Sequence, residues 1–264
     1  MACKATLRDA IFGLAVGDAL GVPYEFQVRD TFTCTDMVSG GTYGKPAGTW
    51  SDDTSMTLAT CDSIRENEGL IDEDDIRARF VDWMNTGRYT VDGMFDIGNT
   101  CATALREGRG CTGGRSNGNG SLMRIVPLAF TCATDDDVAA VSAITHAHAM
   151  SIDFCQRYVR IARRLAAGEG LLAIEEIAER ADVPREQVQS SGFVKHTYDA
   201  ALWCLANTQS YAECVLAAVN LGSDTDTTAA VAGALAGIAY GEDAIPVNWL
   251  KALRGKDLIE RTLF

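Results

Sequence analysis

The segment LGSDTDTTAAVAGALAGIAYG, residues 221–241, joins an acidic, hydroxyl-rich start to a long run of small apolar residues. Apolar positions recur with helical spacing, so the sequence predicts a helix over residues 225–240. Gly233 and Gly237 lie within it, although each interior glycine costs roughly 1 kcal/mol relative to alanine. Close approach of another backbone would offset that cost.

A second glycine-rich helix is predicted near the start of the chain, over residues 5–21. Its glycines recur every four residues: Gly13, Gly17 and Gly21. Such spacing also occurs in membrane helices, but Asp18 interrupts this helix and Asp226 lies at the start of the other. We therefore expect a tightly crossed helical core in a soluble protein.

Helical periodicity continues along nearly the whole chain, and no convincing alternating strand interrupts it. The sequence predicts a single all-α domain over residues 1–264. The expected helices span residues 5–21, 53–68, 74–86, 97–107, 136–148, 151–167, 173–182, 197–206, 210–220 and 225–240. Residues 173–189 could instead form a helix-turn-helix, but the acidic chain favours two short surface helices.

The overall charge limits the classes of partner. The 264 residues are 47% hydrophobic and carry a formal net charge of -13. This balance argues against a nucleic-acid grip, although a local site can still attract a small anion. No apolar run reaches the length of about 18 residues that a membrane helix needs.

The cysteines and the N-terminal residues indicate a cytoplasmic protein. Nine cysteines are scattered without any CxxC pair, which favours buried free thiols in a reducing compartment over disulfides or zinc. The first residues lack the pattern of a signal peptide. The chain shows no coiled-coil pattern, so we expect a monomer.

Two segments place more acid at a helix start than capping requires. GTWSDDTSMTLATCDSI, residues 48–64, offers two aspartates and neighbouring hydroxyls in its SDDT stretch (51–54), and SDTDTT, residues 223–228, does the same. N-capping explains either segment alone. If the two starts meet, four carboxylates converge, and two divalent cations would neutralise them. Oxygen ligands favour Mg²⁺, Mn²⁺ or Ca²⁺ over zinc, and a metal pair can orient a substrate and activate water.

A glycine-rich segment, residues 107–130, is the least helical part of the chain. Its GxGxxG match at 108–113 follows a helix rather than a strand, which excludes a dinucleotide fingerprint. SNGNGS, residues 116–121, could direct backbone N–H groups at an anion, and a flexible loop explains it equally well. His146 and His148 form an HxH expected on a helix, where the side chains diverge and cannot share a zinc ion.

Six segments, taken in order, resemble the ADP-ribosylglycohydrolase family. They are GLAVGDALGVPYEF (13–26), GTWSDDTSMTLA (48–59), DIGNT (96–100), SNGNGSLMRIVPLA (116–129), THAH (145–148) and LGSDTDTTAAVAGALAGIAYG (221–241). The resemblance implies a compact orthogonal all-α bundle around a cleft that holds two metal ions, Mg²⁺ or Mn²⁺.

The resemblance also implies roles for individual residues. The implied metal ligands are Ser51, Asp52, Asp53, Asp224, Asp226 and Thr227. Ser51 stands where the family commonly has Thr, and a hydroxyl is kept. Glu25 matches a glutamate that can gate the cleft, and Asp96 an aspartate proposed to assist chemistry at the ribose. The implied substrate-binding residues are Asn99, Ser116, Asn117, Gly118, Asn119 and His146.

The implied activity is hydrolysis of the bond between ADP-ribose and a modified protein side chain, most commonly arginine. ADP-ribosylated protein, or an ADP-ribosyl small molecule, is then the partner and ADP-ribose the product. We expect Glu25 and Asp96 to handle protons, since the other carboxylates are occupied as ligands. Two alternatives stay open: another linkage, such as serine-linked, poly(ADP-ribose) or O-acetyl-ADP-ribose, and a non-catalytic binding or structural member of the family.

Overall fold

The structure is a computed structural model that describes residues 5–264 as an assembly of helices. The α-helices are α1 (Leu7–Gly21), α2 (Asp52–Glu66), α3 (Glu73–Thr86), α4 (Asn99–Glu107), α5 (Asp135–Ala143), α6 (Ala149–Ala166), α7 (Glu175–Ala178), α8 (Val194–Ala206), α9 (Tyr211–Val219), α10 (Thr225–Tyr240), α11 (Val247–Ala252) and α12 (Lys256–Thr262). The 3₁₀ helices are η1 (Val22–Tyr24), η2 (Leu122–Arg124), η3 (Val126–Phe130), η4 (Leu171–Ala173), η5 (Arg185–Gln187) and η6 (Glu242–Ala244). Strand-like pairing in residues 5–264 is limited to three isolated bridges, which confirms the all-α class.

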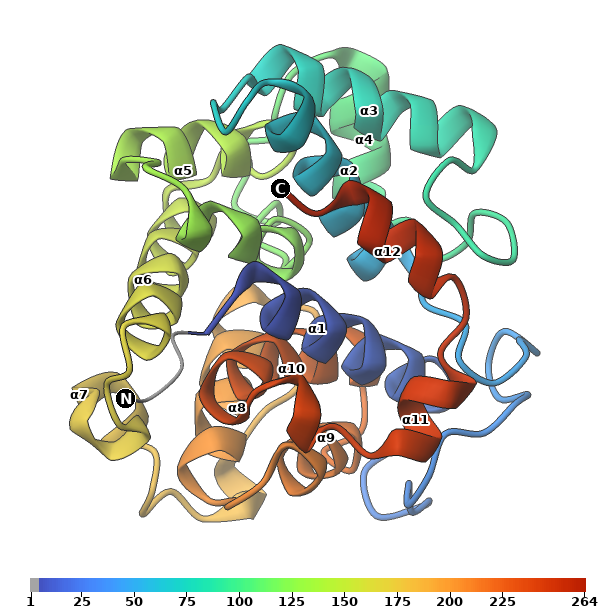
Figure 1. The fold of residues 1–264 in the computed structure, drawn as a ribbon, viewed down its shortest axis with the longest axis vertical. Helices are drawn as coiled ribbons and strands as arrows, with labels where there is room; N and C mark the ends of the chain where they lie inside the picture. Colours follow the sequence, from blue (N-terminus) through green and yellow to red (C-terminus); the bar gives the residue numbers. More distant parts are fainter. Residues whose placement is uncertain (1–4) are drawn as a thin grey trace.

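The glycine-rich helices α1 and α10 pack directly against each other in the middle of the molecule (Figure 1). A Cβ added to Gly17 would lie 2.1 Å from the carbonyl oxygen of Ala229, and one added to Gly13 would lie 2.3 Å from that of Gly233. No side chain fits at these distances, so the glycines allow the two backbones to touch. The prediction of a tightly crossed core is confirmed.

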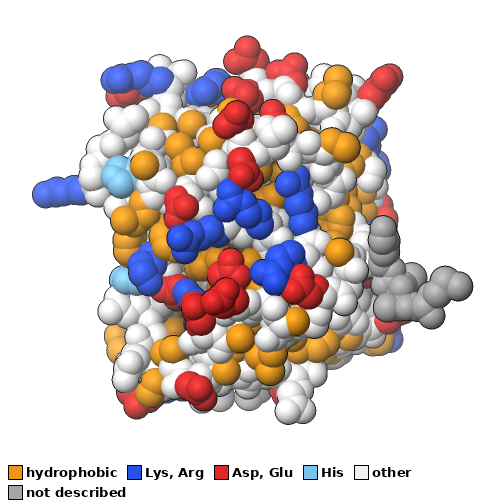
Figure 2. All heavy atoms as spheres, turned by 90° about the vertical axis from the view of Figure 1, so that its left-hand side faces the viewer, with side chains coloured by type: hydrophobic (Ala, Val, Ile, Leu, Met, Phe, Trp, Pro, Cys, Tyr) orange, Lys and Arg blue, Asp and Glu red, His pale blue; other side chains and the backbone are white. Residues whose placement is uncertain are grey.

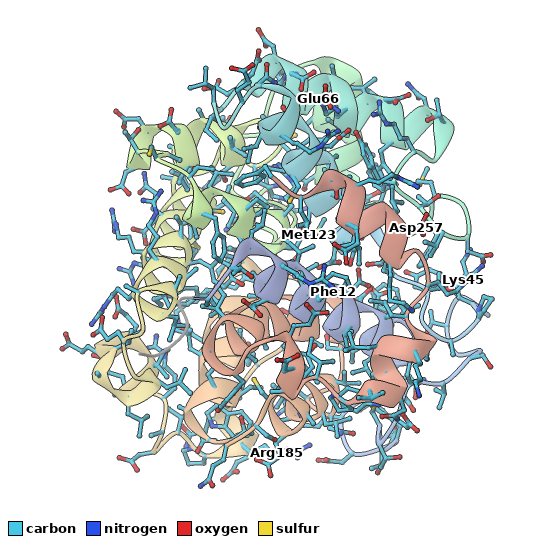
Figure 3. All side chains as sticks on the ribbon, in the orientation of Figure 1. Phe12, Lys45, Glu66, Met123, Arg185 and Asp257 are labelled. Carbon is cyan, nitrogen blue, oxygen red and sulfur yellow. The ribbon has the colours of Figure 1, made fainter. Side chains whose placement is uncertain are left out.

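The remaining helices surround this pair and bury a continuous apolar core. In Figure 1, α2, α3 and α4 lie above α1, while α8, α9 and α11 lie below it. Met123 lies near the middle of the molecule in Figure 3, whereas Glu66, Lys45 and Arg185 lie toward its outline. The start of α10 lies against the end of α1, where the Thr225 hydroxyl donates to the Gly21 carbonyl at 2.8 Å. This contact fixes the acidic start of α10 inside the molecule.

Most predicted helices are observed within three residues of their expected ends, but two differ. The helix expected over 136–148 ends at Ala143, because the backbone at 145–147 bonds to Cys111 instead of continuing the helix. The prediction that His146 and His148 lie on a helix is therefore wrong. The helix expected over 173–182 is reduced to four residues, because successive i to i+3 bonds replace it. This excludes the helix-turn-helix alternative.

The surface and the cysteines agree with the composition. On the face over α5, α6 and α7, Figure 2 shows basic side chains gathered across the middle with acidic side chains directly beside them. Ion pairs such as Arg160–Asp135 and Arg164–Glu169 account for this mixture.

The eight described cysteines are all free thiols. No helix within residues 5–264 combines the length and the apolar character needed to cross a membrane.

Candidate metal centre

Capping accounts for only part of the two acidic helix starts. The Ser51 hydroxyl caps α2 by accepting from the Asp53 N–H at 3.3 Å. Asp224 occupies the N-cap position of α10, yet its side chain makes no capping hydrogen bond. Capping therefore accounts for one hydrogen bond of the Ser51 hydroxyl and leaves the aspartates without an explanation.

The two helix starts meet, although their contacting residues Asp53 and Thr227 lie 174 positions apart in the sequence. The Thr227 hydroxyl donates to Asp53 Oδ2 at 3.3 Å, and the Ser51 hydroxyl donates to the same oxygen at 3.1 Å. Asp224 Oδ2 accepts from Asn119 Nδ2 at 2.9 Å, which links this centre to the glycine-rich loop. The meeting on which the metal hypothesis depends is present.

Several carboxylate oxygens at this centre have no protein partner. Glu25 Oε2, Asp53 Oδ1, Asp224 Oδ1 and Asp226 Oδ2 are buried without a hydrogen bond from any described residue. Glu25, Asp96 and Asp226 each place one oxygen within 4.8 Å of the others. Burying an unpartnered carboxylate is costly, and hard divalent cations are bound by such oxygens. The acidic cluster could therefore bind metal.

The crowded negative charge of the centre raises the pKa values of several of its carboxyl groups. Burial, followed by the charge of Asp96, raises the pKa of Asp52 well above its usual range. Burial and the charge of Glu25 do the same to the pKa of Asp226. Burial, with the charge of Asp96, raises the pKa of Glu25 to about 9. A bound cation would oppose each of these shifts by favouring the charged carboxylates.

Asp18 is a supporting residue whose role the sequence analysis missed. Its carboxylate accepts from the N–H of Ser51 at 2.9 Å, from the N–H of Thr54 at 3.0 Å and from the Thr54 hydroxyl at 2.6 Å. It thereby fixes the start of α2 against α1. The signal available in the sequence is a lone aspartate among the small apolar residues of the second half of α1, and the structure shows that this aspartate is buried.

A cavity of about 400 Å³ opens next to the acidic cluster. It is lined by Glu25, Phe26, Asp52, Asp96, Gly98, Asn99, Thr100, Cys101, Arg115, Gly118, Asn119, Gly120, Met123, His146, Gly192, Asp224 and Thr227. Most predicted site residues are in this set. Ser51, Asp53 and Asp226 are instead buried next to the cavity. Ser116 and Asn117 belong to the adjoining loop and do not line it. The ligand, catalytic and substrate-binding roles of all these residues stay predictions.

His146 forms part of the cavity wall and packs under the glycine-rich loop. A Cβ on Gly120 would lie 2.9 Å from His146 Cε1, and one on Gly118 would lie 3.4 Å from its Nε2. None of the glycines between 113 and 120 has a left-handed φ, so the loop lacks the alternation of an anion-binding nest. Burial, with the charge of Arg124, lowers the pKa of His146 to about 3, which keeps the ring neutral.

Two further side chains at the cavity were absent from the sequence-based site. Tyr43 donates from its hydroxyl to Asp96 Oδ1 at 2.7 Å and so orients that carboxylate. Arg115 is exposed and is the one Lys or Arg among the described lining residues. The sequence predicts no catalytic or binding role for either residue. Only the folded structure shows that they lie at the cavity.

The backbone around the cavity adopts unusual conformations. Phe26, Asp96 and Ser223 have left-handed φ angles of 64°, 58° and 65°. Non-glycine residues in this region are costly and cluster at functional sites. Two of the three directly adjoin acidic residues of the centre, Glu25 and Asp224, and the third is Asp96 itself.

Comparison with known proteins agrees with this architecture. The ADP-ribosylglycohydrolase family model matches residues 2–263. ADP-ribosylarginine hydrolase Tri1 of Pseudomonas putida (strain GB-1) is 34% identical over 281 residues, which cover 96% of this chain and 76% of that protein. ADP-ribosyl-[dinitrogen reductase] glycohydrolase of Rhodospirillum rubrum is 34% identical over 277 residues, with 96% and 91% covered. A solved structure described as an ADP-ribosylglycohydrolase-related protein complex has a TM-score of 0.80 at 28% identity and covers 96% of this chain and 94% of its own. The chain belongs to the ADP-ribosylglycohydrolase family.

Proposed function

We propose that this protein is a metal-dependent hydrolase that removes ADP-ribose from modified arginine side chains of proteins. The observation that carries the proposal is the cavity itself. It joins an acidic cluster with unpartnered oxygens to a polar loop and one exposed arginine. The names of the two relatives support the choice of ADP-ribosylarginine and of a modified protein as substrate.

Two divalent cations, Mg²⁺ or Mn²⁺, fit the acidic cluster because its orphaned oxygens are hard anionic ligands. The residues that would hold them are Ser51, Asp52, Asp53, Asp224, Asp226 and Thr227. When bound, such ions supply Lewis-acid polarisation of a water molecule or of ribose hydroxyls. The hydrogen bonds of Asp18 to the start of α2 hold the first half of this set in place.

The cavity wall would bind the ADP-ribose part of the substrate. Asn99 offers an amide group, and Asn119, whose Nδ2 already donates to Asp224 and Thr197, offers its amide oxygen. The neutral His146 ring forms part of the same wall. Arg115 supplies the positive charge that a diphosphate needs in a chain of net charge -13. Arg115 thus attracts an anionic substrate locally, although the net charge of the protein is negative.

Glu25 and Asp96 would handle the protons of the reaction. Glu25 Oε2 lacks a protein partner, so it is free to donate a proton to the departing arginine nitrogen. Asp96, oriented by Tyr43, would accept a proton from the water that attacks C1″. The C1″–N bond breaks, a C1″–O bond forms, and the products are ADP-ribose and unmodified arginine.

A turnover assay on a panel of linkages tests the proposal. Chelator-treated protein is incubated with ADP-ribosylarginine, ADP-ribosylserine, poly(ADP-ribose) and O-acetyl-ADP-ribose, with and without Mg²⁺ or Mn²⁺. We expect release of ADP-ribose from the arginine linkage only when metal is present, and loss of that release in Asp226→Ala. Turnover of another linkage alone would reassign the substrate. ADP-ribose binding without turnover of any linkage would indicate a non-catalytic member.

A further inference from the structure

An open groove of about 500 Å³ adjoins the cavity and shares Phe26 with it. Its apolar lining consists of Phe26, Val28, Val188 and Leu221. Gln27 and Gln189 add side-chain amides to the same groove. Because Phe26 belongs to both the groove and the cavity, a molecule that reacts in the cavity can extend into the groove without a break.

The exposed side chains of the groove are fixed in position by the backbone. Phe26 is 67% exposed and Val28 is 70% exposed. The N–H of Phe26 donates to the Ser223 carbonyl at 2.6 Å, and the N–H of Ser223 donates to the Gln27 carbonyl at 2.8 Å. A left-handed conformation is unfavourable for a non-glycine residue, and these bonds hold Phe26 in it. The fold therefore presents a large apolar side chain to solvent at the mouth of the cavity.

Arg29 makes the groove rigid and leaves no free cation in it. Its guanidinium donates to the carbonyls of Leu221, Arg185 and Val188 at 2.7, 2.9 and 2.6 Å. Arg29 is the one basic residue among the described groove-lining residues, and carbonyls already occupy its donors. The groove thus suits an uncharged or basic chain and does not suit a diphosphate, for which the cavity provides Arg115.

We propose that this groove binds the polypeptide that flanks the modified arginine, with Phe26 and Val28 as its apolar contacts. The inference rests on the proposed function and extends it to recognition of the acceptor protein. The amides of Gln27 and Gln189 can bond to the backbone of an extended segment, and the exposed Glu186 on the groove favours basic neighbours of the arginine. The groove distinguishes a modified protein from a modified small molecule.

The test compares two substrates that share the reacting bond. The measured quantity is the ratio of kcat/KM for an ADP-ribosylated, arginine-containing protein to kcat/KM for free ADP-ribosylarginine. Val28→Ser should lower this ratio about tenfold, since it removes an apolar contact with the polypeptide only. Phe26 also lines the cavity, but any effect of Phe26→Gly on the shared ADP-ribose cancels in the ratio, so this variant should lower the ratio about tenfold as well. Glycine also relieves the left-handed backbone, so Phe26→Gly should not unfold the protein.

Two matched variants complete the design. Arg115→Ala should lower kcat/KM for both substrates equally and leave the ratio unchanged, because it removes a contact with the shared ADP-ribose. Leu70→Ser, at a residue that is 72% exposed and outside the groove, should change neither value. Unchanged ratios in both Phe26→Gly and Val28→Ser would overturn the groove proposal. Failure of the unmodified protein to cleave either substrate would instead overturn the proposed function.

Discussion

Asp226 is a buried carboxylate with an oxygen that lacks a hydrogen-bond partner within residues 5–264, which is unfavourable in a protein without metal. It lies fully buried at the start of α10, and its Oδ2 has no hydrogen-bond partner among the described residues. Its backbone is fixed by close contact with Gly21, where a Cβ would lie 2.3 Å from the Asp226 Cα. The side chain therefore cannot move away from its acidic neighbours. Under the proposed function, this arrangement lowers the stability of the metal-free protein and provides a ligand for a cation.

Asp226→Asn should separate stability from function. The amide keeps the shape of the side chain and removes one charge, so the chelator-treated variant should be about 1–2 kcal/mol more stable than the unmodified protein. It should also lose hydrolysis. The measurement is urea unfolding in chelator, paired with the turnover assay.

A metal titration provides the control for this variant. Mn²⁺ should raise the melting temperature of the unmodified protein, because a ligand that binds only the folded state stabilises it. The variant should respond much less. A variant that is less stable than the unmodified protein in chelator would contradict the account of orphaned charge.

At the scale of residues, the sequence predicts the composition of the site better than its geometry. The paired aspartates of residues 51–54 and 223–228 are visible because they exceed the needs of a cap. The sequence carries no comparable signal for Tyr43, Arg115 and Asp18. The role of each depends on contacts between segments that are distant in the sequence. His146 was matched by resemblance, while its position follows from an early helix end at Ala143.

At the scale of elements, the contact between α1 and α10 positions the centre. Glycine is required at this interface because a Cβ would clash with carbonyl oxygens of the opposite helix. The φ angles there are ordinary for any residue. The glycine spacing predicted close packing, and the structure adds which two helices touch. The short helices α11 and α12 were not predicted, because six or seven residues show too little periodicity.

Gly17→Ala should destabilise the protein although alanine is the better helix former. The added Cβ would lie 2.1 Å from the Ala229 carbonyl oxygen, so the two helices must separate. We expect a loss of about 3 kcal/mol, larger than the roughly 1 kcal/mol gained from helix propensity. Gly170→Ala is the matched control, with no atom within 4 Å and an ordinary φ, and should change stability by less than about 0.5 kcal/mol. Equal stability of both variants in urea unfolding would refute the close contact.

Asp62 is the buried centre of an ion cluster that joins α2 to α3 and the residues after it. Asp62 accepts from Arg65 at 2.8 Å, from the Tyr89 hydroxyl at 2.7 Å and from Arg88 at 3.0 Å, and it also pairs with Arg79. Burial alone would raise the pKa of Asp62, but these hydrogen bonds and the charge of Arg79 outweigh it and lower the pKa.

Asp62→Asn should therefore cost about 2–3 kcal/mol of stability at pH 7. Because the folded protein lowers this pKa, the contribution is present above the unfolded pKa of about 3.9 and is lost as the pH falls through the lower folded value. Urea unfolding at pH 7 and at pH 3 should show the difference between variant and unmodified protein shrinking at the lower pH. Asp82→Asn, which removes an exposed partner of Arg88, should cost less than about 1 kcal/mol at either pH. A pH-independent loss in Asp62→Asn would contradict the assignment.

At the scale of the whole molecule, the fold brings together segments that are distant in the sequence. Residues 25, 51–54, 96, 115–121, 146 and 224–227 surround one cavity or adjoin it. No periodicity or local propensity predicts such a meeting, and only the ordered series of six motifs indicated it. The single domain, the monomeric state and the cytoplasmic location stay predictions.

The central claim is that the two acidic helix starts jointly hold divalent metal. The most direct test is anomalous diffraction at the manganese edge from crystals of the protein grown with Mn²⁺. The account predicts two peaks within coordination distance of carboxylate oxygens from both segments, Asp52 and Asp53 on one side and Asp224 and Asp226 on the other. Absence of a peak there at saturating Mn²⁺, or peaks bound by only one of the two segments, would contradict it.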